Sequence, residues 1–326
     1  MKIAIVGATG LVGGTFLKVL EERDLKIEKL YLFASKNSAG KEIQFRGKTY
    51  IIEELGENSF EREIDIALFS AGGDISKKYA PIAVENGILV IDNSSAWRME
   101  EEVPLIVPEV NPEKAFENRG IIANPNCSTI QCMLPLKALS QKYGLKRVIF
   151  NTYQAVSGSG LKGIQDLEGG ARGEEPRNYP HPIVNNCLPH IDQFLQNGYT
   201  KEEMKMVNET RKILGIPHLP INATCVRVPV LNGHSVSITV ELENSFDLED
   251  VRKVLGEFQG LVLQDSVENN LYPLAAEATG RDEVFVGRVR RDFSVENGIS
   301  LWVVADNIRK GAATNAVQIA QLFQKN

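Results

Sequence analysis

The chain begins with a short apolar run that passes directly into glycines: Ile3-Ala4-Ile5-Val6, then Gly7-Ala8-Thr9-Gly10-Leu11-Val12-Gly13-Gly14. The apolar run predicts a buried strand, and residues 11–22 predict a helix. Glycines at this junction permit a tight turn, and they let backbone N–H groups approach a pyrophosphate at the positive end of the helix dipole. Strand, glycine turn and helix in this order therefore predict dinucleotide binding. A turn that serves only close packing is the alternative, but it explains one glycine better than four.

The first 125 residues alternate short apolar runs with helical stretches. We expect strands at 3–6, 30–33, 64–69 and 88–91, and helices at 11–22 and 76–86. This rhythm predicts βαβ units and a parallel sheet. The expected fold of this part is an α/β Rossmann-like dinucleotide-binding domain.

Polar and apolar residues mix more in the second part of the chain. A helix at 129–143 is expected to precede strands at 148–153, 226–230, 236–242, 284–290 and 299–304. The pattern predicts an α+β domain with a mixed, largely antiparallel sheet. Residues 158–190, rich in Gly, Pro and Asn, are expected to be mostly loop.

Residues 308–323 place apolar side chains on one helical face, which is expected to pack back on a neighbouring domain. The predicted NADP-binding domain is therefore 1–125 with 307–326. The second predicted domain is 126–306.

Composition excludes several classes of protein. The chain has 326 residues, 43% hydrophobic and 24% charged, which suits a globular protein of two domains. The 36 Lys and Arg against 42 Asp and Glu give a net charge of −6, which repels phosphate backbones and anionic lipid, so neither a nucleic acid nor a membrane is expected as partner. A strand is predicted at once, without room for a signal peptide, and a cytoplasmic location is expected.

The loop after the second predicted strand bears on the choice between NAD and NADP. NAD-binding strands usually end in an acidic residue, whereas this strand runs into Ala34-Ser35-Lys36-Asn37-Ser38. Hydroxyls, an amide and a cation suit a 2′-phosphate, which favours NADP; a solvated Ser-rich loop is the alternative. Ser70-Ala71-Gly72-Gly73 follows the third core strand, where a second turn would pass the cofactor, or where a helix simply begins.

Of the four cysteines, Cys127 has an activating context. It stands in Asn124-Pro125-Asn126-Cys127-Ser128-Thr129, at the start of a predicted helix, where the helix dipole stabilises a thiolate. Cys132, Cys187 and Cys225 are interpreted as small buried hydrophobic residues. No Cys-x-x-Cys pair is present, and no metal is expected.

Of the four histidines, His234 stands on a predicted turn between two strands, from which an imidazole can project into a cleft. His181, His190 and His218 are expected to be structural or exposed. A cysteine, a histidine and a dinucleotide together suggest an acylating aldehyde dehydrogenase, in which a thiolate adds to an aldehyde and the adduct gives hydride to nicotinamide. Without a dinucleotide the same pair would suggest a cysteine hydrolase.

Further motifs follow in chain order: DNSSAWR at 92–98, VPEVN at 107–111, QAVSG at 154–158, EEMK at 202–205, GHS at 233–235 and DN at 306–307. With the glycine turn and the cysteine motif, they resemble the aspartate-β-semialdehyde dehydrogenase family over essentially the whole chain. The resemblance implies interconversion of L-aspartate 4-semialdehyde, phosphate and NADP⁺ with L-4-aspartyl phosphate and NADPH, in the biosynthesis of lysine through diaminopimelate, threonine and methionine. It also implies that 126–306 is a catalytic and dimerisation domain, which forms a homodimer through the central sheet.

The resemblance assigns site residues. Cys127 would be the nucleophile that forms the acyl-enzyme, His234 the general acid/base, and Gln154 would hold substrate and attacking group in line. The implied substrate- and phosphate-binding residues are Arg98, Asn93, Asn126, Gln154, Glu202, Lys205 and Arg227. The implied cofactor-binding residues are Gly7, Thr9, Gly10, Leu11, Val12, Ser35, Asn37, Ser38, Ser70, Ala71, Gly72, Ser157, Gly158 and Asn307.

The charged residues of this set answer to specific groups of the substrate. Arg98 would bind phosphate, Arg227 would grip the carboxylate with its two-pronged donor, and Glu202 would meet the α-ammonium. From spacing alone, Glu202 and Lys205 would be a solvated i, i+3 pair on a helix. Asn37 stands where the family usually has a basic residue, which leaves the strictness of NADP over NAD open.

Two rival functions remain at this point. One is a sister enzyme of the same chemistry, an N-acetyl-γ-glutamyl-phosphate reductase or a glyceraldehyde-3-phosphate dehydrogenase. The other is a non-catalytic NADPH-binding regulator in which Cys127 is a redox-sensitive thiol. Glu202 with Arg227 favours an amino-acid substrate with a free ammonium group.

Overall fold

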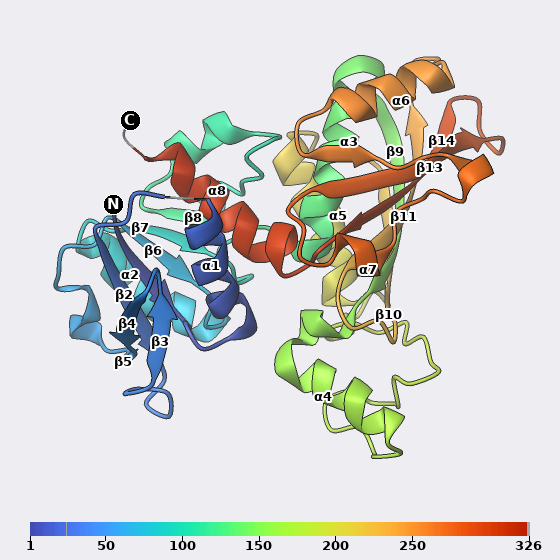
Figure 1. The fold of residues 1–326 in the computed structure, drawn as a ribbon. Helices are drawn as coiled ribbons and strands as arrows, with labels where there is room; N and C mark the ends of the chain where they lie inside the picture. The colour runs from blue at the N-terminus through green and yellow to red at the C-terminus, as the bar shows by residue number, and fades with distance from the viewer. Residues whose placement is uncertain (24, 325–326) are drawn as a thin grey trace. The chain divides into compact units, whose positions relative to one another are not determined.

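The computed structural model describes residues 1–23 and 25–324, which form two compact units (Figure 1). The first unit is Met1–Pro125 with Ala312–Asn326, and the second is Asn126–Gly311. The chain thus re-enters the first unit at Ala312, later than the predicted 307. Residues 306–311 stay with the second unit because the Asp306 carboxylate accepts the N–H groups of Gly280 and Arg309, and the Asp306 carbonyl accepts that of Gly311.

The first unit contains a six-stranded parallel sheet, as predicted. Its spatial order, β5-β2-β1-β6-β7-β8, is the 3-2-1-4-5-6 order of a doubly wound dinucleotide-binding fold. The direction of winding reverses between β1 and β6, so the turn after β1 lies at the switch point. The strands are β1 (Lys2–Val6), β2 (Lys29–Ala34), β5 (Glu53–Glu54), β6 (Ile66–Phe69), β7 (Leu89–Asp92) and β8 (Ile121–Ala123).

Alternate residues of β1 enter two separate cores. Ile3 and Ile5 pack with residues of α1 (Leu11–Glu22) and α8 (Thr314–Leu322), while Ala4 and Val6 pack with residues of α2 (Gly73–Glu85). This is the burial on both faces that a parallel sheet requires. A two-stranded hairpin of β3 (Glu42–Phe45) and β4 (Lys48–Ile51) completes the unit.

The second unit contains a six-stranded mixed sheet in the order β10-β9-β11-β14-β13-β12. The β10–β9 and β13–β12 pairs are parallel and the other three are antiparallel, which confirms the predicted sheet type. The strands are β9 (Leu145–Gln154), β10 (Ile221–Arg227), β11 (His234–Leu242), β12 (Leu261–Leu263), β13 (Val284–Asp292) and β14 (Gly298–Ala305).

The predicted strand at 226–230 was wrong in its bounds. Strand β10 ends at Arg227, because Pro229 lacks the N–H that a ladder requires and the Val230 N–H donates to the carbonyl of Val228 in a tight turn. His234 consequently begins β11 instead of standing on the turn before it.

The helices of the second unit are α3 (Cys127–Tyr143), α4 (Gly160–Ala171), α5 (Lys201–Leu214), α6 (Leu248–Glu257) and α7 (Ala275–Ala278). The prediction that 158–190 is mostly loop holds for 172–190, but it missed helix α4. Its glycines weaken helix propensity, but Gly163 is needed because a Cβ there would lie 2.3 Å from the Val156 carbonyl oxygen. The Asp166 carboxylate also accepts the N–H groups of residues 177–179, which fastens the following loop to the helix.

Short helical turns connect these elements. Four are 3₁₀ turns, and one, next to the unit boundary, is a π-helix. They are Glu57–Phe60, Pro112–Glu117, Val156–Ser159, Val267–Asn269 and the π-helix Arg309–Ala313. Within the described part of the chain, no helix has both the length and the apolar character needed to cross a bilayer.

Candidate active site

Cys127 is the first residue of helix α3, as the sequence predicts. It is partly exposed, and the Asn126 side chain caps the helix: its Oδ1 accepts the N–H groups of Ser128 at 3.0 Å and Thr129 at 3.3 Å. The main-chain N–H of Asn126 donates to Glu209 Oε2 at 2.7 Å. The sulfur therefore lies at the positive end of a 17-residue helix. The first turn of this helix is fixed by the Asn126 side chain and by the bond from Asn126 N–H to Glu209.

The carboxylate of Glu202 gathers three of the predicted substrate residues. Its Oε1 accepts from Gln154 Nε2 at 3.0 Å and from Asn126 Nδ2 at 2.9 Å, and its Oε2 accepts from Lys205 Nζ at 3.0 Å. Lys205 also donates to Asp192 at 2.8 Å. The structure thus brings Asn126, Gln154, Glu202 and Lys205 into one hydrogen-bonded cluster.

Lys205 pairs with two carboxylates, Glu202 and Asp192, so the cluster keeps one net negative charge. Burial raises the pKa of Glu202, but the Lys205 ammonium and the hydrogen bonds lower it to about 2. Burial lowers the pKa of Lys205, and its two carboxylate partners raise it well above its ordinary value. Both groups are therefore ionised at neutral pH, and the Glu202–Lys205 pair is not the solvated pair that its spacing suggests.

His234 is fully buried at the start of β11. Its Nδ1 accepts the main-chain N–H of Ala155 at 3.0 Å, so the neutral ring carries its proton on Nε2. Burial, reinforced by the charge of Arg227 and opposed by that of Glu202, lowers the pKa of His234 to about 3. The imidazole is therefore neutral at physiological pH.

The Ala155 peptide connects His234 to Arg227, the last residue of β10. Arg227 Nη1 donates to the Ala155 carbonyl at 2.7 Å, while the Ala155 N–H holds the imidazole. Gly158 lies against both side chains, since a Cβ there would be 2.9 Å from Arg227 Nη1 and 3.1 Å from His234 Nε2. The predicted cofactor residue Gly158 thus contacts the predicted carboxylate and acid/base residues.

Two buried donors of this group have no partner in the described chain: Arg227 Nε and His234 Nε2. Buried polar atoms are nearly always hydrogen-bonded, and an exception invites a ligand as explanation. A guanidinium beside an imidazole N–H can receive a carboxylate and a carbonyl oxygen.

Ser157 and Asn307 also meet within the second unit. Asn307 Nδ2 donates to Ser157 Oγ at 3.0 Å, and Asn307 Oδ1 accepts the Gly233 N–H at 2.9 Å, next to His234. Gly311 packs on Cys127, since a Cβ there would lie 2.9 Å from Cys127 Cβ.

Three predicted cofactor segments meet in the first unit. Gly7 has φ +91°, and a Cβ on it would lie 2.5 Å from the carbonyl oxygen of Ser70. Thr9 Oγ1 lies 3.4 Å from Ser38 Oγ, and Gly10 precedes α1 without a side chain to cap it. Leu11 and Val12 form the first turn of α1, while Ser35, Asn37, Ala71 and Gly72 lie in the loops after β2 and β6.

Arg98 and Asn93 form a second cluster of the first unit. Arg98 is buried, and its Nε and Nη2 donate to the carbonyls of Asn124 and Asn93 at 2.9 and 3.0 Å. Asn124 Nδ2 donates to Asn93 Oδ1 at 2.6 Å. Asn93 and Arg98 follow the carboxyl end of β7, and Asn124 follows that of β8. Open α/β sheets bind ligands at this edge.

The remaining cysteines and histidines divide by burial. Cys132 and Cys225 are buried, which raises the pKa of both thiols, and Cys225 lies inside β10. Cys187 is exposed, contrary to the prediction, because it lies on the long loop between α4 and α5. His181 and His218 are exposed, and His190 stacks on Phe194.

Comparison with known proteins agrees on one family. The model of the semialdehyde dehydrogenase NAD-binding domain matches residues 2–118, and that of the semialdehyde dehydrogenase dimerisation domain matches residues 136–310. The aspartate-semialdehyde dehydrogenase of Aquifex aeolicus is 56% identical, over 99% of this chain and 98% of that protein. That of Bacillus subtilis is 47% identical, over 100% and 98%.

This chain belongs to the aspartate-semialdehyde dehydrogenase family. The crystal structure of aspartate semialdehyde dehydrogenase II from Vibrio cholerae complexed with ASA has a TM-score of 0.95 and 49% identity, over 98% of this chain and 97% of that one. The enzyme from Candida albicans with NADP has a TM-score of 0.78 and 27% identity, over 98% and 97%. The resemblance and the prediction of an oxidoreductase are therefore confirmed.

Sequence reasoning missed several residues of the candidate site. Ala155 acts through its main chain, which no side-chain pattern reveals. Asp192 and Glu209 contact the site from distant parts of the chain, and neither stands in a motif. Gln131, on α3, carries one signal, because a glutamine inside an otherwise apolar helical segment is unusual.

Proposed function

We propose that this protein interconverts L-aspartate 4-semialdehyde, phosphate and NADP⁺ with L-4-aspartyl phosphate and NADPH through an acyl-enzyme on Cys127. The observation that carries the proposal is the pair of unpartnered buried donors, Arg227 Nε and His234 Nε2, in the same unit as a cysteine at a helix N-terminus. A substrate with a carboxylate and a carbonyl oxygen supplies both missing acceptors. The buried Glu202 carboxylate supplies the counter-charge for an α-ammonium.

The first unit has the features that a dinucleotide requires. The N-terminus of α1 follows Gly10, which offers no side chain to cap it, and the approach of Gly7 to Ser70 leaves room for no Cβ. Hydroxyls of Thr9 and Ser38, and the absence of a carboxylate at 34–38, suit a 2′-phosphate. NADP bound there would exchange a hydride with the substrate carbon. The NADP of the related Candida albicans structure supports this choice of cofactor.

In the reductive direction, Cys127 Sγ attacks the acyl phosphate carbon, the C–S bond forms, and the bond from that carbon to the phosphate oxygen breaks. The helix dipole of α3 stabilises the attacking thiolate. His234 Nε2–H donates a hydrogen bond to the carbonyl oxygen, where negative charge develops. Because the ring is neutral and its Nδ1 accepts the Ala155 N–H, this donation takes the place of the general acid/base role that the resemblance implies. Gln154 and Glu202 hold the substrate in line, and Arg227 grips its carboxylate. Arg98 and Asn93 of the first unit are proposed to bind phosphate, and Lys205 of the second unit keeps Glu202 ionised.

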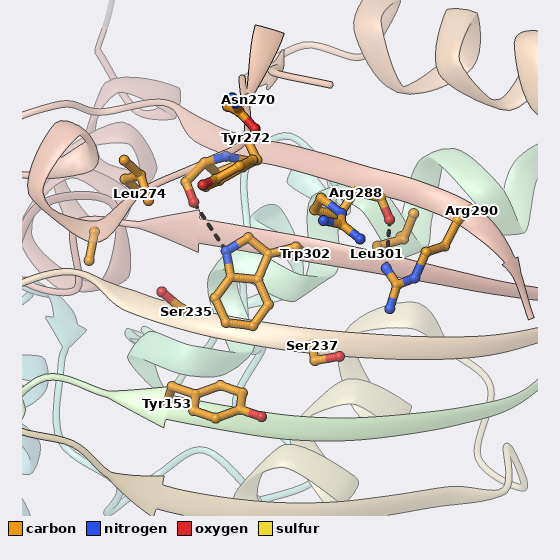
Figure 2. A pocket seen from close by; sticks show the side chains of 12 residues that line it. Tyr153, Ser235, Ser237, Asn270, Tyr272, Leu274, Arg288, Arg290, Leu301 and Trp302 are labelled. Atoms are coloured by element: carbon orange, nitrogen blue, oxygen red, sulfur yellow. Dashed lines mark hydrogen bonds between the residues drawn. The ribbon is translucent and has the colours of Figure 1, made fainter. Parts of the chain in front are cut away.

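We also propose a homodimer formed through the outer face of the second unit's sheet. Tyr153 lies opposite Ser235, and Ser237 lies opposite Trp302, on this face, which holds a pocket (Figure 2). On the other face, Val236, Ile238 and Val240 are fully buried, and α3 packs on β9, β11 and β14. The match of residues 136–310 to a dimerisation domain supports a second copy as the occupant.

One assay tests the function. Oxidation of L-aspartate 4-semialdehyde should form NADPH only when phosphate is present, and NAD⁺ in parallel measures cofactor preference. Cys127→Ser should abolish turnover and the covalent adduct seen by mass spectrometry, while NADPH binding persists. Cys187→Ser, at an exposed cysteine, is the matched control. Turnover of Cys127→Ser at the wild-type rate, or faster oxidation of glyceraldehyde 3-phosphate than of the semialdehyde, would contradict the proposal.

A further inference from the structure

Gln131 joins the helix that carries Cys127 to the strand that carries His234. It lies on α3, one turn after Cys127, and its side chain is fully buried. Its Nε2 donates to the carbonyl oxygen of His234 at 3.1 Å and to that of Val303 at 3.3 Å. One side chain therefore holds carbonyls of two neighbouring strands, β11 and β14, against α3.

His234 is consequently fixed at two points. The Ala155 N–H holds the ring at Nδ1, and Gln131 holds the main chain. The position of Nε2 is therefore determined by the hydrogen bond at Nδ1 and by the one at the His234 carbonyl. The separation between the first residue of β11 and the helix that begins at Cys127 depends on Gln131 directly.

Position 131 has an amide because its N–H groups are used as hydrogen-bond donors; its volume alone could be supplied by an apolar side chain. Its Oε1 is buried and has no hydrogen-bond partner in the described chain. A buried amide oxygen without a partner is costly, whereas leucine or methionine would fill similar space without that cost. What the amide adds is its two N–H groups, and both are directed at strand carbonyls.

We propose that Gln131 is a positioning residue: by holding the main chain of His234 against α3, it determines where the imidazole lies relative to the sulfur of Cys127. The inference rests on the proposed function, and it gives Gln131 no contact with substrate or cofactor. A residue that acts through His234 affects turnover more than substrate binding.

Gln131→Met removes both donors and keeps a side chain of similar size. We expect kcat to fall about 10- to 100-fold, as misplaced catalytic groups do, while the KM for the semialdehyde stays within about twofold. Leu139→Val, a buried substitution further along α3, is the matched control for lost stability. Both variants are compared by their urea unfolding midpoints. If Leu139→Val loses as much kcat as Gln131→Met, the role of Gln131 is general stability and the proposal fails.

A double-mutant cycle identifies the residue through which Gln131 acts. In a His234→Asn background, Gln131→Met should lower kcat by less than about twofold further, because the group that it positions is already gone. A loss as large as that in the wild-type background would overturn the proposal.

Different outcomes would refute the proposed function and the positioning role of Gln131. If wild-type protein forms no NADPH from the semialdehyde and phosphate, the proposed function itself is refuted. If wild-type protein is active, Cys127→Ser is inactive and Gln131→Met turns over like wild type, the function stands and the inference on Gln131 is refuted.

Discussion

His234 is a titratable side chain that the fold keeps neutral. The Ala155 N–H occupies Nδ1, burial removes water, and Arg227 adds an unfavourable positive charge. An imidazolium would lose the Nδ1 hydrogen bond and would repel the guanidinium. The same three features leave Nε2–H as the group available to a substrate oxygen.

This neutrality predicts how stability depends on pH. The pKa of His234 is about 3 in the folded protein, against about 6.5 in an unfolded chain, so the unfolded state binds the extra proton between these values. The stabilisation from neutral His234 is complete above about pH 6.5 and is lost progressively as the pH falls towards 3. In His234→Asn, the slope of unfolding free energy against pH should be smaller by up to about 1.4 kcal/mol per unit in this window.

Urea unfolding of both proteins across this pH range measures the difference. Carboxylates such as Glu202, whose pKa is also lowered, contribute to the slope in wild type and variant alike, so they cancel in the comparison. Parallel curves for the two proteins would show that His234 titrates normally in the folded state.

For single residues, the sequence identifies the chemistry of a side chain but does not reveal its burial. The i, i+3 spacing of Glu202 and Lys205 is that of an exposed pair, yet Glu202 is 4% exposed because Gln154 and Asn126 converge on it from other elements. Convergence of this kind depends on tertiary contacts. The resemblance to a family predicted these residues, and local spacing alone could not.

Helix α3 depends on its first turn, where a cap and a nucleophile are neighbours. Asn126→Ala removes the acceptor of the Ser128 and Thr129 N–H groups and should cost about 1 kcal/mol of unfolding free energy. It also frees the residue before Cys127 from Glu202. We expect the rate of iodoacetamide alkylation of Cys127 to change by more than about threefold, because the geometry of the helix terminus supports the thiolate.

Asp247→Ala is the matched control, since Asp247 caps α6 in the same way through the N–H groups of Glu249 and Asp250. It should cost a similar unfolding free energy and leave the alkylation rate of Cys127 unchanged. If wild type, Asn126→Ala and Asp247→Ala are alkylated at equal rates, the cap of α3 does not influence the reactivity of Cys127.

Elements with strong periodicity were predicted well, and those held by tertiary contacts were not. The βαβ rhythm predicted β1, β2, β6 and β7 closely. Helix α4 was missed because its glycines resemble loop composition, while the contacts that stabilise it, from Asp166 to residues 177–179, lie outside the helix.

The whole molecule is built from two units, of which the first is not contiguous in sequence. The apolar face predicted at 308–323 packs in the core of the first unit from Ala312 onwards, where Ala316, Ile319 and Ala320 meet residues of α1, while Ile308 belongs to the second unit. The point of return could not be predicted, because residues 306–311 are bound to the second unit through hydrogen bonds of Asp306.

The proposed homodimer places its contact on the outer face of the second unit's sheet. A two-fold dimer presents the same patch twice, so one charge placed on the sheet face is buried twice. Tyr153, whose ring lies 5.4 Å from that of Trp302, is 39% exposed on this face. Tyr153→Glu should therefore convert the dimer to monomer in sedimentation velocity. Ile51→Glu, at an exposed apolar residue of the β3–β4 hairpin, should leave the dimer intact. If Tyr153→Glu sediments as wild type does, the second copy covers a different surface.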